Sequence, residues 1–321
     1  MSAHVLAVGE ALVDEVHRPD GSTAEHAGGS IANVALTLGR LDREVRLATW
    51  LGRDARGDLV RDWLAESDVT VVEGSDGAER TSVAVATLDG SGAATYSFDL
   101  TWQVPPGATA GPDTLAVHTG SIAAVLEPGG SQVRALLEAA RATSTVTYDP
   151  NARPAIMGDA DAVRPRIEAL VAVADVVKVS DEDLGWLYPG QSPADVARAW
   201  LAGATGSTPP DGGAEPRSTG PALVVVTLGG EGALAVTAAG TLEVAAPRVE
   251  VVDTVGAGDS FMGALIDGLW EHDLLGAQRR EALRTIGPAT LTAVLEQCVA
   301  VAAVTVSRAG ANPPRRAEVA R

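Results

Sequence analysis

The chain has 321 residues, one cysteine and a formal net charge of -18 at pH 7. Nucleic acids and anionic membranes select cationic surfaces, so this charge excludes both as expected partners. The single cysteine, Cys298, excludes an intramolecular disulfide, and without a nearby His and Cys pattern it predicts core packing rather than a metal site. An anionic substrate would need local dipoles and a few placed cations, because the overall field repels it.

The first ten residues, MSAHVLAVGE, lack the basic region and cleavage pattern of a secretory signal. They lead directly into an apolar run that is typical of a first strand. No apolar run approaches the ~18 residues of a membrane span. We therefore expect a cytoplasmic protein without a membrane segment.

Short apolar, β-branched runs recur along the chain and predict strands. They lie at residues 4–8, 45–50, 115–118, 145–148, 176–179, 223–228 and 233–236. Helical periodicity separates several of them, as in residues 31–41, where Ser30 is the expected helix cap, and in residues 133–142. This alternation predicts a mostly parallel sheet covered by helices on both faces, with ligands beyond the carboxyl ends of its strands.

Two stretches depart from the alternation of strands and helices. Residues 12–26 and 82–102 alternate apolar and polar side chains without a following helix, which predicts half-exposed antiparallel strands in a small second sheet. Residues 203–221 are dense in Gly, Pro, Ser and Thr and predict a flexible surface loop without chemistry of its own.

The stretch Asp253 to Phe261, DTVGAGDSF, follows a predicted strand end at Val251 and Val252 and precedes a helical pattern. Such a turn points unpaired N–H groups of a helix start at whatever lies above it, which suits a phosphate. A carboxylate beside a transferring phosphoryl group repels it, so Asp259 is better suited to accept a proton from a hydroxyl nucleophile. The same residues also fit a tight turn in which Asp259 is only a helix cap.

DTVGAGDSF resembles the C-terminal signature of the PfkB, or ribokinase-like, family of carbohydrate kinases. An N-terminal match supports this: AGGSIANVALTLGRL, residues 27–41, is similar to the GG-x-x-x-N-x-A segment of the family. The two segments occur in the family's order, so the resemblance covers nearly the whole chain. It implies one ribokinase-like domain over residues 1–321, a three-layer α/β/α sandwich with a small β-sheet lid formed by residues 12–26 and 82–102.

The resemblance also implies roles for individual residues. Asp259 would be the catalytic base, and the backbone amides of Gly256, Ala257 and Gly258 would form the anion hole for the γ-phosphoryl group. The implied sugar pocket contains Asp14, Gly28, Gly29 and Asn33. Without the resemblance, Asp14 also fits a solvated charge on an edge strand, and Asn33 a polar residue on an exposed helix face.

DPNARP, residues 149–154, resembles a segment of fructokinases and 2-keto-3-deoxygluconate kinases. Arg153 would contact a phosphate oxygen, although a surface ion pair is an equal alternative. KVSDEDL, residues 178–184, occupies the place of the family's N-x-x-E motif, with Ser180 replacing Asn and Asp183 replacing Glu. The resemblance implies that Ser180 borders the nucleotide and that Asp183 serves Mg²⁺.

Two further segments concern the nucleotide and a monovalent cation. In LVVVTLGGEGA, residues 223–233, the resemblance places Thr227, Gly229 and Gly232 beside the ATP phosphates and ribose, whereas a plain hairpin explains the same glycines. Asp253 and the carbonyl of Val255 would help to bind a monovalent cation such as K⁺.

The reaction that the resemblance implies is phosphoryl transfer from ATP·Mg²⁺ to a sugar hydroxyl, in an expected homodimer. Fructose is the favoured acceptor. Ribose, 2-keto-3-deoxygluconate and a nucleoside are alternative acceptors. A 2-keto-3-deoxygluconate kinase would want a cation such as Arg18 or Arg80, and a nucleoside kinase an aromatic clamp such as Trp50 or Trp102. A sugar-binding sensor without catalysis is the alternative from another class.

Overall fold

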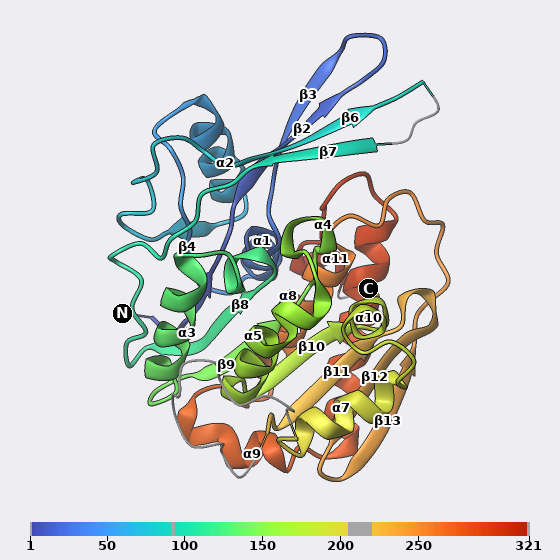
Figure 1. The fold of residues 1–321 in the computed structure, drawn as a ribbon. Coiled ribbons are helices and arrows are strands. Elements are labelled where there is room, and N and C mark those ends of the chain that lie inside the picture. The colour runs from blue at the N-terminus through green and yellow to red at the C-terminus, as the bar shows by residue number, and fades with distance from the viewer. Residues whose placement is uncertain (1, 91–93, 205–219, 320–321) are drawn as a thin grey trace.

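A large sheet lies between two layers of helices in the computed structural model, which describes residues 2–90, 94–204 and 220–319, and a small sheet projects above this body (Figure 1). The large sheet has nine strands in the order β13-β12-β11-β10-β9-β8-β1-β4-β5. They are β1 (His4–Val8), β4 (Val45–Ala48), β5 (Val69–Val71), β8 (Thr114–Gly120), β9 (Thr145–Asp149), β10 (Val176–Ser180), β11 (Leu223–Thr227), β12 (Gly232–Thr237) and β13 (Gly240–Ala245).

The central strand β1 explains why the sheet is covered on both faces. Val5 and Ala7 belong to one hydrophobic core, and Leu6 and Val8 belong to a second core on the other face. Successive strand side chains point to opposite faces, so a strand buried on both faces has a continuous apolar sequence. The predicted parallel pairing is confirmed from β5 to β11, whereas β12 and β13 pair antiparallel.

Helices fill the two outer layers of the predicted three-layer sandwich, which is confirmed. One core contains side chains of α1 (Ser30–Arg40), α2 (Ala55–Ala65), α8 (Ala257–Glu271) and α10 (Pro288–Val306). The other contains side chains of α3 (Gly129–Ala140), α5 (Ala160–Val173), α6 (Asp181–Leu187) and α7 (Pro193–Leu201). Three shorter helices are α4 (Pro154–Met157), α9 (Arg280–Arg284) and α11 (Arg316–Val319).

The segment before α8 differs from the prediction of a strand. Residues 246–256 form no strand, and Val251 and Val252 are more than half exposed. The backbone N–H groups of Val252 and Asp253 both donate to the carbonyl of Val306 at the end of α10, at 2.8 and 3.2 Å. The backbone of this β-branched segment is therefore hydrogen-bonded to the end of α10 and not to a neighbouring strand.

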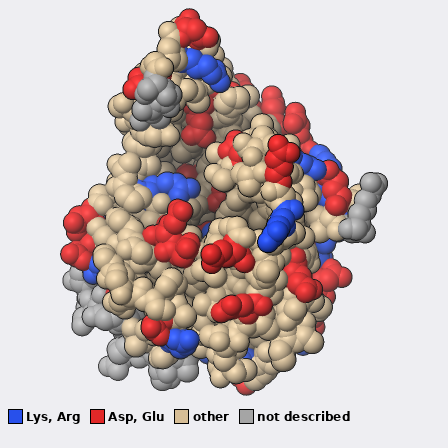
Figure 2. All heavy atoms as spheres, turned by 90° about the vertical axis from the view of Figure 1, so that its right-hand side faces the viewer, with Lys and Arg blue, Asp and Glu red and all other residues tan. Residues whose placement is uncertain are grey.

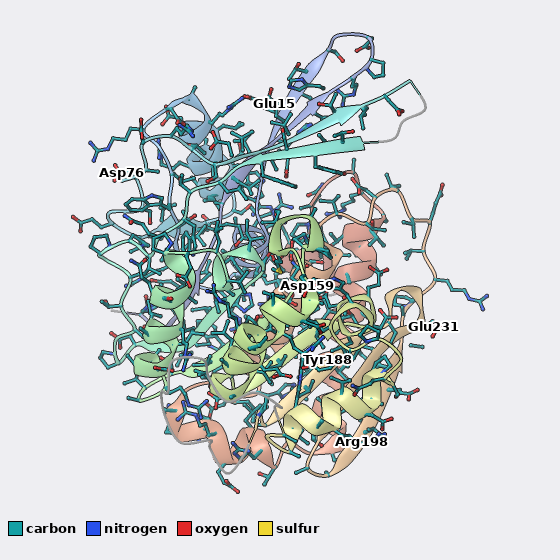
Figure 3. All side chains as sticks on the ribbon, viewed as in Figure 1. Glu15, Asp76, Asp159, Tyr188, Arg198 and Glu231 are labelled. Atoms are coloured by element: carbon teal, nitrogen blue, oxygen red, sulfur yellow. The ribbon has the colours of Figure 1, made fainter. Side chains whose placement is uncertain are left out.

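The small sheet has the strand order β3 (Thr23–Gly28), β2 (Leu12–His17), β6 (Val83–Leu88) and β7 (Ala94–Asp99). Each predicted stretch forms an antiparallel hairpin, but β2 and β6 pair in parallel, which corrects the expectation of antiparallel pairing throughout. Glu15, labelled in Figure 3, forms an ion pair with Arg56 of α2. One face of the small sheet is thereby fixed toward α2.

Helix α10 meets the length and hydropathy expected of a membrane span, with a mean hydropathy of 1.7 over its best window, so the expectation that no segment does so was wrong. The helix packs against α8, and its Cys298 is fully buried, as predicted. Length and composition alone are weak evidence, since a core helix passes the same test. Of the loop predicted at residues 203–221, positions 205–219 lie outside the described residues.

Candidate active site

Polar side chains converge where β1, β9 and β10 end and where α1 and α8 begin. Strand β1 has β4 on one side and β8 on the other, so the chain leaves it in both directions. Open α/β sheets bind ligands at such a switch point. Figure 2 shows a hollow between the projecting small sheet and the main body, with acidic side chains around it.

The carboxylate of Asp259 is held by three side chains from distant parts of the sequence. The Oγ of Ser30 donates to its Oδ1 at 2.8 Å, and the Nδ2 of Asn151 donates to the same oxygen at 3.0 Å. The Nδ2 of Asn33 donates to Oδ2 at 2.8 Å. Asp259 is only 5% exposed, so these donors replace the water that would otherwise solvate its charge.

Asp259 is not the cap of α8. The N-cap is Gly256, which has a φ of 75°, and no side chain caps this helix end. A Cβ on Gly256 would lie 2.6 Å from the Cβ of Ala311, so both backbone angle and space require glycine here. The simple cap interpretation therefore fails, because the carboxylate of Asp259 bonds to other side chains.

The N–H groups expected in the anion hole are only partly free. Ala257 donates its N–H to the carbonyl of Thr254 at 3.2 Å, which differs from the role implied for it. The N–H groups of Gly256 and Gly258 donate to no acceptor among the residues that the structure describes. These two groups and the positive end of α8 are what the turn offers to an anion.

A buried ion pair lies beneath the first turn of α8. The Nζ of Lys178 is 2.9 Å from the Oδ2 of Asp149, and a Cβ on Gly258 would lie 2.9 Å from the same Nζ. Burial raises the pKa of Asp149 to about 6, although Lys178 acts to lower it. Sequence reasoning missed Lys178. The available signal was that it is the only lysine in a chain that has many arginines.

Glu10, which directly follows Gly9 after β1, is a second group that the sequence did not reveal. Its carboxylate accepts the N–H groups of Ser30 and Ala123, each at 3.3 Å. Burial raises its pKa to about 7, and the charge of Asp259 acts in the same direction. A buried acidic residue in an apolar N-terminal run was the available signal.

The start of α1 also differs from the prediction, since Gly29, with a φ of 112°, is its N-cap and Ser30 is its first residue. A Cβ on Gly29 would lie 2.6 Å from the carbonyl oxygen of Glu10. The hydroxyl of Ser30 points to Asp259 and caps nothing. Asn33, one turn later, is buried rather than on an exposed face.

Asp14 lies above this group on β2, which is an inner strand of the small sheet and not the edge strand considered from sequence. A Cβ on Gly28 would lie 2.4 Å from its Oδ2. The pKa of Asp14 is raised because the surrounding protein reduces its solvation, although the side chain keeps exposed surface and the charges of His26 and Arg153 act to lower the pKa. Two residues of the expected sugar pocket, Asp14 and Gly28, and the expected phosphate contact Arg153 are therefore close neighbours.

Arg153 forms none of the surface ion pairs that the structure records. Its Nη1 donates to the Oδ1 of Asn151 at 2.7 Å and to the carbonyl of Ala152 at 3.0 Å. Asn151 itself has a φ of 35°, which is rare for a residue other than glycine. The guanidinium thus braces the turn that directs Asn151 to Asp259, and Asn151 was missed as a site residue.

Ser180 and Asp183 belong to the start of α6. Ser180 is its N-cap, and its Oγ accepts the N–H of Asp183 at 3.0 Å. The Oδ1 of Asp183 accepts the N–H of Ala152 at 3.0 Å, which ties this segment to the turn of Asn151. Both side chains are therefore engaged in hydrogen bonds to backbone N–H groups, Ser180 within its own helix start and Asp183 across to the turn of Asn151.

Thr227, Gly229 and Gly232 lie in the hairpin between β11 and β12. Gly232 has a φ of 120°, and a Cβ there would lie 2.0 Å from the carbonyl oxygen of Val244. The plain hairpin therefore accounts fully for this glycine. Within the described part of the chain no hydrogen bond or ion pair joins these three residues to Asp259, and their nucleotide role stays a prediction.

Asp253 links two segments next to α8. Its Oδ1 accepts the N–H of Val255 at 3.0 Å, and its Oδ2 accepts the N–H of Gly310 at 2.8 Å. Across residues 2–90, 94–204 and 220–319, no group of three or more His, Cys, Asp or Glu side chains is arranged to hold a metal ion. Any cation at Asp183 or Asp253 would depend on backbone carbonyls, water or phosphate for its other ligands.

The comparisons with known proteins agree with this geometry. A family model described as pfkB family carbohydrate kinase matches residues 2–318. The chain belongs to the pfkB family of carbohydrate kinases. Membership confirms the predicted enzyme class, a phosphotransferase that acts on a carbohydrate hydroxyl.

Two relatives in sequence and one solved structure are similar to this chain. A fructokinase of Rhizobium leguminosarum bv. trifolii is 32% identical over 284 residues, covering 84% of this chain and 81% of the relative. An aminoimidazole riboside kinase of Salmonella typhimurium is 32% identical over 290 residues, covering 84% of each. The crystal structure of a fructokinase with bound ATP from Xylella fastidiosa superposes with a TM-score of 0.80 at 24% identity, covering 100% of this chain and 98% of that one. This pfkB kinase therefore has the ribokinase-like fold that the sequence predicted.

Proposed function

We propose that this pfkB kinase is an ATP-dependent fructokinase that transfers the γ-phosphoryl group to a hydroxyl of fructose. The observation that carries the proposal is the convergence of Ser30, Asn33 and Asn151 on the carboxylate of Asp259, beside the start of α8. The likeness to a fructokinase over 84% of the chain supports the choice of sugar.

In this proposal Asp259 accepts the proton of the attacking hydroxyl. The N–H groups of Gly256 and Gly258 and the dipole of α8 face the charge that develops on the phosphoryl group. Lys178, paired with Asp149, places a positive charge beneath the turn in a chain whose net charge of -18 otherwise repels an anionic substrate. Positioning and electrostatics account for most of the acceleration in phosphoryl transfer, and the base adds about 10²- to 10⁴-fold.

The small sheet is proposed to act as a lid over the sugar, with Asp14 and Arg153 near its hydroxyls. Closure of such a lid excludes water and suppresses wasteful ATP hydrolysis. The sheet is also the proposed homodimer contact, because Tyr96 and Phe98 on its edge strand β7 stack on each other and stay 59% and 36% exposed. Sedimentation of the wild type and of a Tyr96→Ser, Phe98→Ser variant tests the dimer. The wild type should sediment as a dimer and the variant as a monomer.

Two cations are part of the proposal. Magnesium enters with ATP, and Asp183 fits it because Mg²⁺ keeps most of its waters and needs only one or two carboxylates beside phosphate. Asp253 and the carbonyl of Val255 are proposed to take a monovalent cation such as K⁺, since each carboxylate oxygen of Asp253 has a lone pair beyond its recorded N–H bond. Use of ATP also supports a cytoplasmic address.

The alternatives differ in what the sugar site would need. A sugar acid would want a free cation, but Arg80 is held by both oxygens of Asp99 at 2.6 and 2.8 Å. A nucleoside would want an aromatic clamp, but Trp102 is buried and donates to the carbonyl of Ala123. The similarity to a riboside kinase makes a riboside the second candidate acceptor.

An ATP-consumption screen tests the proposal across hexoses, pentoses, sugar acids and nucleosides at equal concentration. Fructose should give the highest kcat/KM. A higher value with a riboside would assign the second candidate instead, and binding of sugar without turnover of any acceptor would favour the sensor.

A further inference from the structure

Ser30 contacts two buried carboxylates at once. Its backbone N–H donates to the Oε1 of Glu10 at 3.3 Å, and its Oγ donates to the Oδ1 of Asp259 at 2.8 Å. The Nδ2 of Asn151 donates to the same Oγ at 2.7 Å. Ser30, Glu10 and Asp259 are all less than one-tenth exposed, so water cannot easily replace these contacts.

The direction of the hydroxyl proton follows from these partners. A serine hydroxyl has a single proton to donate, and its oxygen already accepts a hydrogen bond from Asn151. The carboxylate of Asp259 has no proton to offer when it is ionised, so the proton of Ser30 points at Oδ1. Since Asn33 binds Oδ2, Ser30 and Asn33 together set the plane of the carboxylate.

We propose that Ser30 is a positioning residue for the carboxylate of Asp259 and that Glu10 holds Ser30 in place. The inference rests on the proposed role of Asp259 as the base. A base must present a lone pair to the substrate hydroxyl, and a carboxylate free to rotate would present it for only part of the time. Ser30 and Glu10 touch no reacting atom in this scheme and act through Asp259.

Glu10 makes the arrangement sensitive to pH. The groups that face its carboxylate are the N–H of Ser30, the N–H of Ala123, the hydroxyl of Ser121 and the charge of Asp259. Its raised pKa of about 7 means that Glu10 gains or loses its charge near neutral pH. When ionised it binds the N–H of Ser30 more strongly, and its charge makes Asp259 a better proton acceptor.

Ser30→Ala tests the first half of the proposal. We expect kcat to fall about tenfold, as for loss of one hydrogen bond to a charged group, with the KM for sugar and ATP within about twofold of wild type. The matched control is Ser144→Ala, because Ser144 is also buried, its hydroxyl is hydrogen-bonded to the carbonyl of Thr114 and to the hydroxyl of Thr143, and it lies at the opposite end of β9. Its kcat should equal that of the wild type.

Glu10→Gln tests whether Glu10 holds Ser30 in place. This test can still be carried out if the Ser30→Ala variant fails to fold. The ratio of wild-type to Glu10→Gln kcat should rise about threefold or more between pH 6 and pH 8, because only the wild type gains the charge. Titration of ATP and sugar cancels in this ratio. Glu168→Gln is the control, since Glu168 is a buried carboxylate of α5 that binds the hydroxyl of Tyr188, and its ratio should be flat.

Asp259→Asn separates this inference from the proposed function. If Asp259→Asn is inactive, an unchanged kcat in folded Ser30→Ala or a flat ratio for Glu10→Gln overturns the inference and leaves the base in place. If Asp259→Asn turns over at near the wild-type rate, the base assignment fails and the inference fails with it.

Discussion

The ammonium of Lys178 lies 2.9 Å from the carboxylate of Asp149, and both side chains are almost completely buried below the first turn of α8. Removing one member of a buried pair costs more than removing both, because the remaining charge is left without a partner. Lys178→Met should therefore lower the free energy of unfolding by about 3 to 5 kcal/mol at pH 7.5. Urea denaturation measures this loss.

The double variant Lys178→Met, Asp149→Asn is the control for the pair. It removes the buried charge but keeps an acceptor for the N–H of Asn151, which Asp149 binds at 3.2 Å. It should unfold at higher urea than the single variant at pH 7.5, and the difference should shrink at pH 5, where Asp149 becomes protonated. Equal stability of the two variants at pH 7.5 would contradict an ion-pair role.

Replacing Asp259 with Asn tests the chemistry most directly. The amide keeps the shape of the carboxylate but cannot accept the proton of a hydroxyl, so kcat should fall by about 10² to 10⁴. Calorimetric titration should give dissociation constants for sugar and ATP that stay close to those of the wild type. Loss of sugar binding with unchanged thermal stability would instead indicate that Asp259 holds the substrate.

The sequence predicted the frame of the fold because burial on both faces leaves a continuous apolar signal in β1, and DTVGAGDSF located Asp259. It did not predict the partners of Asp259. Asn151 reaches it only because the turn after β9 adopts a positive φ, and Ser30 because Gly29, which directly follows β3, is the cap of α1. Contacts between residues more than a hundred positions apart depend on register and turn geometry, which no local pattern encodes.

Gly256 allows a test of backbone geometry at the start of α8. Gly256→Ala should cost about 2 to 4 kcal/mol, since it adds left-handed strain to a clash with Ala311. Gly190→Ala is the matched control, because Gly190 has a similar φ of 79° in the hydrogen-bonded turn from Tyr188 to Gln191 and open space around the new Cβ, so this change should cost only about 1 kcal/mol. Denaturant midpoints measure both, and equal losses would show that the contact with Ala311 is unimportant.

The stability of the folded protein should depend on pH through Glu10. Folding raises the pKa of Glu10 from 4.5 to about 7, so between these values the folded state holds a proton that the unfolded state has lost. The contribution of Glu10 to stability is therefore most favourable below pH 4.5 and falls as pH rises to 7. The unfolding free energy of the wild type, relative to Glu10→Gln, should drop by about 3 kcal/mol across this window.

His118 is the reason to measure that drop as a difference between two proteins. Burial lowers its pKa to about 3, so the unfolded state binds the extra proton between pH 3 and 6.5, and His118 makes stability rise with pH in that window. This rise opposes the effect of Glu10 in the wild type, but it is present in both proteins and cancels. Urea titrations at pH 4.5, 5.5, 6.5 and 7.5 give the difference, and a value that stays constant with pH would mean that Glu10 keeps its ordinary pKa in the folded protein.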